Sequence, residues 1–244
     1  MLKNERKQKI LALVEQAGYV TLETLSQMLD SSESTIRRDL TELDESGKLK
    51  RVHGGAERLT TLLHEENVAE KSVKNVQEKR QIAQKAVSKL TNGDVIFMDA
   101  GTTVAMMTEF LSKFDKITVV TNSVHTAAIL LDKQIKTIII GGAIKPETDA
   151  VIGNFAVQQL MSFNFNKAFV GANGISRNGG VTTPDDEEAT IKRLVLRQAK
   201  EKFILADKSK LGKTYFAKIA AFDDSIEIIT EEIDDLHSHT QSVH

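Results

Sequence analysis

The sequence predicts a chain of two domains: a small N-terminal winged helix-turn-helix, followed by a larger α/β domain with a doubly wound, largely parallel sheet. Two patterns carry this prediction. Apolar residues recur at helical spacing through residues 3–43, and short runs rich in β-branched residues alternate with helical patterns from residue 95 onward. The 244 residues, 41% of them hydrophobic and 27% charged, suffice for a core in each domain.

The composition limits the function classes. The chain has no cysteine, which excludes disulfides and cysteine metal sites. It shows neither a hydrophobic signal peptide nor an apolar run of membrane-spanning length, so we expect a cytoplasmic protein without a membrane partner. The formal net charge is -2 and the pI is about 6.3, so overall charge does not indicate nucleic-acid binding. Any DNA contact must therefore be local.

Two helices are expected at the start of the chain. The first covers residues 3–16 and stops at Ala17-Gly18, because glycine readily adopts the left-handed conformation that closes a helix. The second is short and starts after Thr21, whose hydroxyl suits a helix N-cap. Its apolar residues are Leu22, Leu25, Met28 and Leu29, after which Asp30-Ser31 breaks the pattern.

A third helix is expected from Glu33, with Ser32 as N-cap and a stop near Gly47. At about 100° per residue, Ile36, Leu40 and Leu43 fall on one side. The opposite side is polar and cationic, with Ser34, Thr35, Arg37, Arg38 and Thr41. Alone, this pattern also fits a solvated surface helix. Behind a short preceding helix, it fits the recognition helix of a helix-turn-helix, which enters the major groove.

A β-hairpin is expected over residues 48–56, where a short extended run meets the glycine turn Gly54-Gly55. Lys48, Lys50 and Arg51 can reach DNA phosphates, and the glycines let the tip approach a sugar-phosphate backbone. His53 either contacts the phosphates together with these cations or is an exposed residue of the turn without a role in binding. Through residue 58 the chain has ten basic and ten acidic residues, but the cations gather at the N-terminus, on the third helix and in this hairpin.

Two segments carry a family resemblance. Ser-Glu-Ser-Thr-Ile-Arg-Arg-Asp-Leu at 32–40 and Leu-Lys-Arg-Val-His-Gly-Gly-Ala at 49–56 resemble the winged helix-turn-helix signature of the DeoR family of bacterial transcription regulators. The resemblance implies binding to double-stranded operator DNA; the alternative is a helical protein-protein module. The candidate DNA-binding residues are Ser32, Ser34, Thr35, Arg37, Arg38, Thr41, Lys48, Lys50, Arg51, His53 and Gly54.

Four regions follow from these patterns: a DNA-binding domain at 1–58, a charged and partly helical linker at 59–75, an effector domain at 76–233 and a flexible tail at 234–244. A helix is expected over 76–90, ended by Asn92-Gly93. Strands are expected at 95–98, 117–120, 137–140, 168–170, 203–206 and 226–229, and helices at 104–111, 124–131, 155–161 and 187–201. Because the strands are almost continuously apolar, we expect both faces of the sheet to be covered.

Polar and glycine-bearing loops follow the predicted strands, at the ends where ligands bind in such folds. Gly101-Thr102-Thr103 and Thr121-Asn122-Ser123 each open a helix, so either can offer backbone N–H groups and hydroxyls to a phosphate. Asp99 or Asn173 then hydrogen-bonds hydroxyls of the same ligand. For each loop taken singly, routine helix capping is the alternative.

The second half, about residues 76–233, resembles the sugar-phosphate-binding effector domain of DeoR-type regulators, itself similar to ribose-5-phosphate isomerase. The matching segments are Asp-Ala-Gly-Thr-Thr at 99–103, Thr-Asn-Ser at 121–123, Gly-Gly at 141–142, Gly-Ala-Asn-Gly-Ile at 171–175 and Ala-Asp-Lys-Ser-Lys at 206–210. The candidate effector-binding residues are Asp99, Gly101, Thr102, Thr103, Thr121, Asn122, Ser123, Gly141, Gly142, Gly171, Asn173, Lys192 and Lys210.

The departures from the isomerase bear on activity. Its acidic Asp-Gly-Ala-Asp loop is replaced by Val170-Gly171-Ala172-Asn173, and its catalytic glutamate aligns with Lys192, although Glu187 and Glu188 lie close to that register. Isomerisation needs a carboxylate base. We therefore expect sugar-phosphate binding without turnover, so no catalytic residue is assigned. Lys192 and Lys210 become candidate partners of the ligand's anion, or Lys192 is simply an exposed helix lysine.

Other features are read more plainly. Asn178-Gly179-Gly180 is expected to form a turn, and residues 185–188 an acidic helix start that suits the helix dipole. We expect neither metal nor cofactor.

These observations predict a repressor of a sugar-utilisation operon, controlled by a sugar-phosphate effector, with fructose 1-phosphate suggested by the look of the DNA-binding segments. One short recognition helix reads DNA weakly, so a homo-oligomer, dimer or tetramer, is expected on repeated half-sites. An isomerase-like enzyme with a DNA-binding appendage, and a constitutive DNA binder whose second domain only assembles, are the alternatives.

Overall fold

The computed structural model describes residues 2–58, 62–63, 65–222 and 225–231. The chain divides into two compact units, Met1–Thr61 and Leu62–His244. The tail expected at 234–244 lies outside the described residues. Within the described ranges, no helix combines the length and the apolar character that crossing a bilayer requires.

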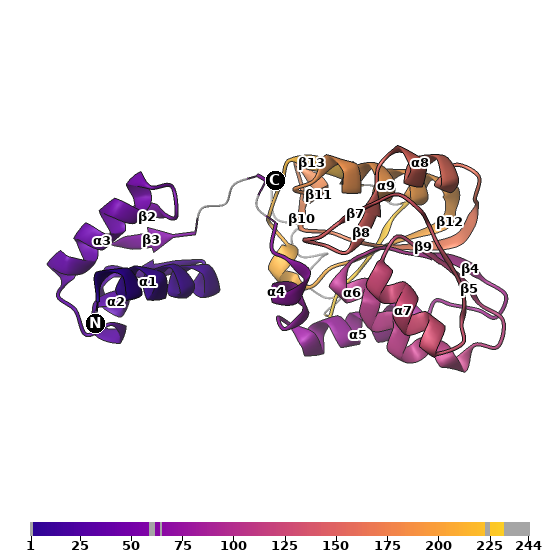
Figure 1. Ribbon diagram of the computed structural model, residues 1–244, viewed down its shortest axis with the longest axis horizontal. Coiled ribbons are helices and arrows are strands. Elements are labelled where there is room, and N and C mark those ends of the chain that lie inside the picture. The colour runs from indigo at the N-terminus through magenta and orange to yellow at the C-terminus, as the bar shows by residue number, and fades with distance from the viewer. Residues whose placement is uncertain (1, 59–61, 64, 223–224, 232–244) are drawn as a thin grey trace, which may run out of the picture. The chain divides into compact units, whose positions relative to one another are not determined.

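The first unit joins a helix-turn-helix to a small antiparallel sheet. Its elements in chain order are α1 (Lys3–Ala17), β1 (Tyr19–Thr21), α2 (Leu22–Met28), α3 (Glu33–Glu45), β2 (Lys50–Val52) and β3 (Gly55–Glu57). The sheet order is β1-β3-β2, and α2 packs against α3 (Figure 1). The predicted helices and hairpin are confirmed.

The core of this unit is formed mainly by the apolar residues that recur at helical spacing in the sequence. Its largest buried side chains come from α1, α2, α3 and the residue before β2: Ile10, Leu25, Ile36, Leu40 and Leu49. Met28 was expected to face inward but is 61% exposed, because α2 ends there and Leu29 turns into the core instead.

Strand β1 was not foreseen, and it changes the meaning of the Gly54-Gly55 turn. Val20 of β1 pairs with Ala56 of β3. A Cβ on Gly55 would lie 2.2 Å from the carbonyl oxygen of Val20, so glycine is required for the close approach of two strands of the unit itself. Gly54 has a φ of 88°, which favours glycine at the hairpin turn.

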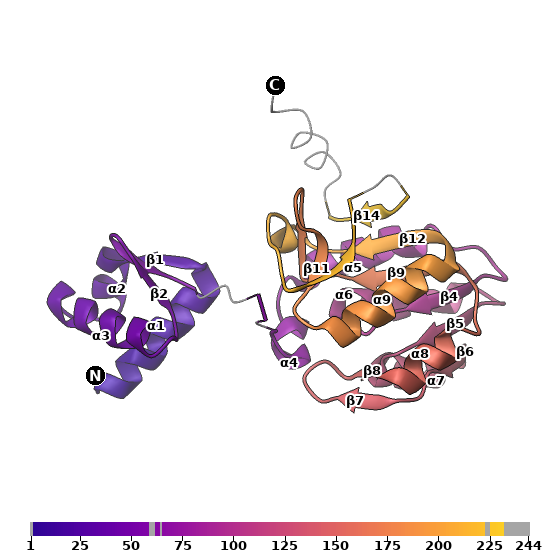
Figure 2. The ribbon, with the colours of Figure 1, turned by 90° about the horizontal axis from the view of Figure 1, so that it is seen from above.

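The second unit is built on a six-stranded parallel sheet of order β14-β12-β9-β4-β5-β6 (Figure 2). The strands are β4 (Val95–Met98), β5 (Thr118–Thr121), β6 (Lys136–Ile139), β9 (Phe165–Gly171), β12 (Ala199–Leu205) and β14 (Glu227–Ile229). All six were predicted within a few residues. Their pairings are parallel throughout, which confirms the fold class.

Helices cover both faces of the sheet (Figure 1). One face carries α5 (Val76–Val87), α6 (Thr102–Ala105), the 3-10 helix η1 (Met106–Lys113) and α7 (Val124–Asp132). The other face carries α8 (Asn154–Leu160) and α9 (Asp186–Gln198). A separate hydrophobic cluster lies on each side, so the sheet is doubly wound as expected.

Two smaller sheets were not predicted. One is the hairpin of β7 (Ala143–Lys145) and β8 (Ala150–Ile152). The other has the order β10-β11-β13 and consists of β10 (Gly174–Ser176), β11 (Gly180–Thr183) and β13 (Ala217–Ala220). The predicted turn at 178–180 joins β10 to β11.

Three expectations about the large sheet need correction. The helix expected at 104–111 is a four-residue α-helix continued by η1. The helix expected to reach residue 201 ends at Gln198, because Ala199 already pairs with Phe165 in β9. Strand β6 is not covered on both faces: it lies at the sheet edge, where Ile138 and Ile139 are 38% and 45% exposed.

The segment expected to be a linker belongs partly to the second unit. The described residues 62–63 and 65–75 include the short helix α4 (Val68–Ser72), which begins with a capping box formed by Asn67 and Glu70. The Val68 N–H donates to the carbonyl of Glu147, and the Phe216 N–H donates to the carbonyl of Leu62. The described part of the predicted linker, residues 62–63 and 65–75, therefore packs against the second unit.

Candidate DNA-binding surface and effector site

Helix α3 presents a polar face from a well-formed N-terminus. The Ser32 hydroxyl accepts a hydrogen bond from the Thr35 N–H and also contacts the Ser34 and Thr35 hydroxyls. Ser34, Arg37 and Arg38 are exposed and Thr41 is half-buried. These side chains lie opposite the buried Ile36 and Leu40.

The cations at the N-terminus hold α3 in place. Arg6 pairs with the buried Asp39 at 2.5 Å, and its pKa is raised by the hydrogen bond to that carboxylate. Lys3 and Lys7 pair with Glu42, and their hydrogen bonds lower the pKa of Glu42 to about 2. We expected these cations to favour DNA through their charge; instead they fix the angle between α1 and α3. Sequence reasoning did not identify Asp39.

The two arginines of α3 differ in their partners. Arg37 pairs with Glu33 one turn earlier, at 3.1 Å. Among the described residues, no hydrogen bond or ion pair engages the guanidinium of Arg38, which is exposed. An arginine held on a helix face without an internal partner can meet the acceptor edge of a base.

The hairpin cations are partly engaged within the unit. The Arg51 guanidinium donates to the Thr41 hydroxyl at 2.7 Å, and the Arg51 N–H donates to Asp44. Lys50 pairs with Glu57 at 2.7 Å. His53 is exposed next to the Gly54 turn, and Lys48 is exposed before the start of β2, at the other end of that strand. The hairpin and α3 thus form one surface, and Arg51 links them.

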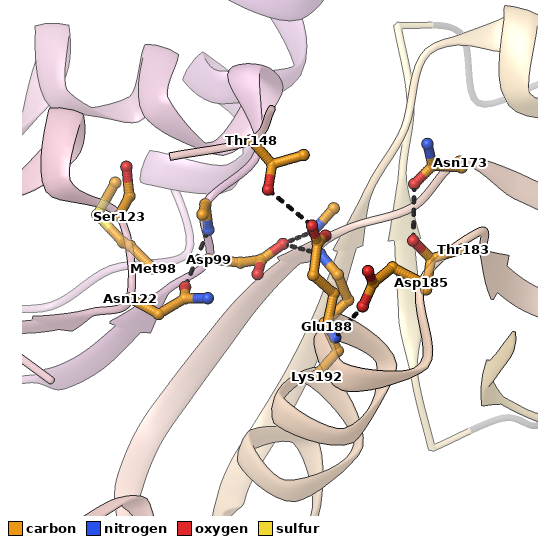
Figure 3. A network of polar contacts seen from close by, with 12 residues as sticks. Met98, Asp99, Asn122, Ser123, Thr148, Asn173, Thr183, Asp185, Glu188 and Lys192 are labelled. Atoms are coloured by element: carbon orange, nitrogen blue, oxygen red, sulfur yellow. Dashed lines mark hydrogen bonds and ion pairs between the residues drawn. The ribbon is translucent and has the colours of Figure 1, made fainter. Parts of the chain in front are cut away.

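In the second unit, Asp99 lies at the end of β4, at the center of a buried polar network (Figure 3). Its Oδ2 accepts from the Gly171 N–H at 3.0 Å and pairs with the Lys192 ammonium. Its Oδ1 is buried and has no hydrogen-bond partner. A buried carboxylate oxygen without a donor is costly, so this atom is suited to accept a ligand hydroxyl.

Lys192 is 4% exposed, so the alternative of an exposed helix lysine is wrong. Burial opposes its charge, but the carboxylates of Asp99, Glu188 and Glu65 outweigh that effect and raise its pKa. Lys192 is therefore a permanent cation at this position.

Several expected ligand groups are used by the protein itself. Ser123 caps α7 by accepting from the Thr126 N–H at 3.0 Å, and the Thr121 hydroxyl donates to the carbonyl of Met98 at 2.6 Å. Asn122 accepts from the Ala100 N–H at 3.0 Å. Within this loop Ser123 caps α7, and Asn122 braces the turn that carries Asp99.

The glycine pair after β6 is not joined to the network by any hydrogen bond among the described residues. Gly141 is exposed, and its N–H donates to the side chain of Gln159. A Cβ on Gly142 would lie 2.5 Å from the carbonyl oxygen of Ile152. Gly142 is thus explained by packing against β8, rather than by a ligand.

The expected anion loop Gly101-Thr102-Thr103 is less regular than predicted. No side chain caps α6, and the α-helical run ends after four residues. This weakens the helix-dipole argument, because the field of a helix end depends on a longer run of aligned peptide groups. Thr103 is nearly buried and Thr102 half-buried.

Side chains that sequence reasoning missed complete the network. Lys145 contacts Asp185 at 2.9 Å, Glu188 at 3.2 Å and Glu65 at 3.8 Å. The Thr148 hydroxyl donates to Glu188, and Asn173 donates to Glu65. We call the following residues the candidate effector site: Glu65, Lys71, Asp99, Lys145, Thr148, Asn173, Asp185, Glu188 and Lys192.

The acidic start of α9 was noticed but read only as a favourable helix end. Asp185 does cap the helix, accepting from the Glu188 N–H at 2.9 Å, and it also pairs with Lys145. Nothing in the local pattern around Lys145 or Glu65 signals their role, because their partners lie far along the chain.

Lys210 lies in a second group of cations, on the 3-10 helix η2 (Lys208–Lys210). Burial lowers its pKa, with a further contribution from Lys71, although Asp207 opposes both. Burial likewise lowers the pKa of Lys79 to about 8, despite Asp207, with Lys210 and Lys71 adding to the effect. Crowded cations with lowered pKa values are stabilised by an anion.

A helix-turn-helix with an exposed arginine, joined to a parallel α/β unit with a buried polar network at its strand ends, defines a DNA-binding transcription regulator with a sensor domain. Residues 6–61 match the DeoR-like helix-turn-helix domain, and residues 74–232 match the DeoR C-terminal sensor domain. The chain belongs to the DeoR family of transcription regulators.

Named relatives cover almost the whole chain. The HTH-type transcriptional regulator FruR of Bacillus subtilis (strain 168) is 42% identical over 95% of this chain and 92% of its own length. The lactose phosphotransferase system repressor of Staphylococcus aureus (strain N315) is 33% identical over 96% and 94%.

Among solved structures, ribose 5-phosphate isomerase A of Methanocaldococcus jannaschii is 19% identical, with a TM-score of 0.42 over 56% of this chain and 55% of that one.

Proposed function

We propose that the protein represses a sugar-utilisation operon in the cytoplasm and that a phosphorylated sugar controls its affinity for operator DNA. The observation that supports ligand binding concerns the two carboxylate oxygens of Asp99. Oδ2 accepts from Lys192 and from the Gly171 N–H, whereas the buried Oδ1 has no hydrogen-bond donor. A sugar hydroxyl supplies that donor. The likeness to the lactose phosphotransferase system repressor supports a sugar operon.

For DNA, we propose that Ser34, Arg37, Arg38 and Thr41 face the major groove. Arg38 is the main base-reading residue, because its guanidinium is exposed and has no internal partner among the described residues. An arginine in this setting favours guanine O6 and N7. Lys48, Lys50, Arg51 and the turn at His53-Gly54 then lie along the phosphates, where Lys50 and Arg51 exchange internal partners for DNA.

We infer binding without turnover. A catalytic carboxylate base must be free to take a proton. Asp99 is paired with Lys192, and Glu188 accepts from Lys145 and Thr148. Incubating the protein with pentose and hexose phosphates at equimolar enzyme should therefore give no interconversion. Turnover of any of them would favour the isomerase-like alternative.

We also propose a homo-oligomer, with a second copy seated on the edge of the large sheet. Strand β6 ends the sheet, and neighbouring elements expose apolar side chains: Leu131, Ile138, Ile139, Ile144, Phe155 and Met161. A two-fold axis perpendicular to an edge strand lets two copies of that strand pair antiparallel, and a dimer places two recognition helices on repeated half-sites. Ile139→Lys should lower the mass seen by light scattering, whereas Val73→Lys, exposed elsewhere, should leave it unchanged.

The direct test is a titration of the protein's own upstream DNA with a panel of phosphosugars, with fructose 1-phosphate first. One member should change operator affinity about tenfold or more, in the range of ordinary allosteric coupling. The unphosphorylated sugar serves as the control. If no phosphosugar changes operator affinity, the second unit serves assembly only.

A further inference from the structure

The candidate effector site contains a carboxylate from outside the α/β framework. Glu65 lies in the segment 62–75, which follows directly on the end of the DNA-binding unit at Thr61. Its side chain is 10% exposed. Oε1 accepts from Lys71 and from Asn173, the latter at 3.1 Å, and Oε2 lies 3.8 Å from the Lys145 ammonium without a hydrogen bond.

The net charge of the site disfavours the binding of a further anion. Its described residues hold four carboxylates, Glu65, Asp99, Asp185 and Glu188, against the three ammonium groups of Lys71, Lys145 and Lys192, a net of one negative charge. Burial opposes ionisation of Glu65, but Lys71, Asn173 and Lys145 together lower its pKa, so it is charged. A phosphate approaching these lysines is repelled while Glu65 remains.

Glu65 is also the carboxylate with the weakest attachment. Asp99 accepts from a backbone N–H of β9, and Asp185 caps α9, on which Glu188 lies. Asp99 and Asp185 are therefore held by backbone N–H groups, and the Glu188 carboxylate, held by Lys145 and Thr148, extends from a residue within α9. The Glu65 carboxylate is held by side chains alone, and Glu65 lies outside any helix or strand, so it can leave without breaking a backbone hydrogen bond.

We propose that Glu65 occupies the subsite for the effector's anionic group and that the effector displaces it. The proposal rests on the proposed function for the ligand being a phosphosugar. Displacement removes the attachment of Glu65 to Lys145 and Asn173, and it weakens the docking of α4, whose Val68 N–H donates to Glu147. The ligand thus loosens the segment that leads into the DNA-binding unit, which gives it unequal affinity for two states of the protein.

The first test compares Glu65→Gln with Glu66→Gln in the full chain. Both substitutions remove one negative charge, and Glu66 pairs with Lys74 rather than with Lys145. With inorganic phosphate as the probe in calorimetry, Glu65→Gln should bind about tenfold more tightly than the parent chain, a difference of about 1.4 kcal/mol. Glu66→Gln should bind like the parent chain.

Each other result overturns the proposal. Weaker phosphate binding by Glu65→Gln would make Glu65 a ligand-binding residue, and unchanged binding would make it a structural one. An equal or larger gain in Glu66→Gln would reflect general charge or place the phosphate at Lys79 and Lys210.

A second measurement uses the parent chain and does not depend on a variant. Saturating phosphate should speed hydrogen exchange across residues 65–72, with the Val68 amide as the reporter, while the amides of β4 stay protected. Slower exchange would show that the anion orders the segment, which contradicts displacement. Phosphosugars that shift operator affinity without these effects would leave the proposed function standing and remove this inference alone.

Discussion

The two units carry their functional groups in opposite ways. In the first, the candidate DNA-binding side chains are exposed on α3 and the hairpin, and ion pairs behind them fix the helix. In the second, the polar groups are buried and satisfy one another, except for atoms such as Asp99 Oδ1. DNA can bind to side chains that are already exposed, whereas a small ligand that enters the buried network must replace hydrogen bonds and ion pairs within the protein. The second unit is therefore the one whose stability depends on its site.

The largest expected effect comes from breaking the buried pair. Lys192→Met leaves the Asp99 carboxylate buried without its cation, which should lower the free energy of unfolding by about 3–5 kcal/mol. Chemical denaturation of the second unit measures it. The double variant with Asp99→Asn is the control and should recover most of the loss, because the uncompensated charge is gone. A single variant as stable as the double one would mean that the pair is not buried in solution.

Removing one hydroxyl at the strand ends should separate sensing from DNA binding. Thr102→Val keeps the shape of the side chain and should remove the operator response to the active phosphosugar, since a hydrogen bond to a charged group contributes about 1.5–3 kcal/mol. Operator affinity without ligand should stay the same. Thr118→Val, at the amino end of β5, is the matched control. A normal response in Thr102→Val would mean that the anion does not contact Thr102 and binds beside Lys145 and Asn173, where Glu65 lies, or at Lys79 and Lys210.

In the first unit the corresponding change is Arg38→Ala, which should weaken operator binding by about 1–3 kcal/mol. Because Arg38 is exposed, thermal stability should not change. Fluorescence anisotropy with labelled operator measures the affinity. Arg80→Ala, which removes a surface arginine paired with Glu109 in the second unit, controls for the loss of charge. Equal losses in the two variants would mean that α3 does not read bases.

The smallest effect concerns the start of α3. Ser32→Ala removes the hydroxyl that accepts from the Thr35 N–H, which should lower the free energy of unfolding of the first unit by about 1 kcal/mol. Circular dichroism during denaturation reports it. Ser46→Ala, at the other end of the same helix, should lower the free energy of unfolding less, because the Ser46 hydroxyl only donates a hydrogen bond to the Leu43 carbonyl.

The contrast between the units also decides what the sequence could reveal. The spacing of Ile36, Leu40 and Leu43 identifies the buried side of α3. The exposed side follows directly, because it is the opposite side of the same helix. The six parallel strands were found for a similar reason: each contains a short apolar run that the sequence shows locally. Local chemistry was enough for the caps Thr21 and Ser32 as well.

What the sequence could not reveal depends on contacts between distant residues. Lys145 meets Asp185 and Glu188, and Glu65 meets Asn173, across 40 to 108 residues of chain. No spacing rule encodes such pairs. The short strands β1, β7 and β8 escaped for the same reason, since three residues carry no period. At Ala199, pairing with β9 overrides a helical pattern that continues into the strand.

The central claim is that one unit binds DNA while a separate buried site in the other senses the ligand. The most direct test measures operator affinity and the affinity for the most active phosphosugar in Arg38→Ala and Thr102→Val side by side. The account predicts that Arg38→Ala loses operator affinity and keeps ligand affinity within about twofold, with the reverse for Thr102→Val. Loss of both affinities in either variant would contradict it.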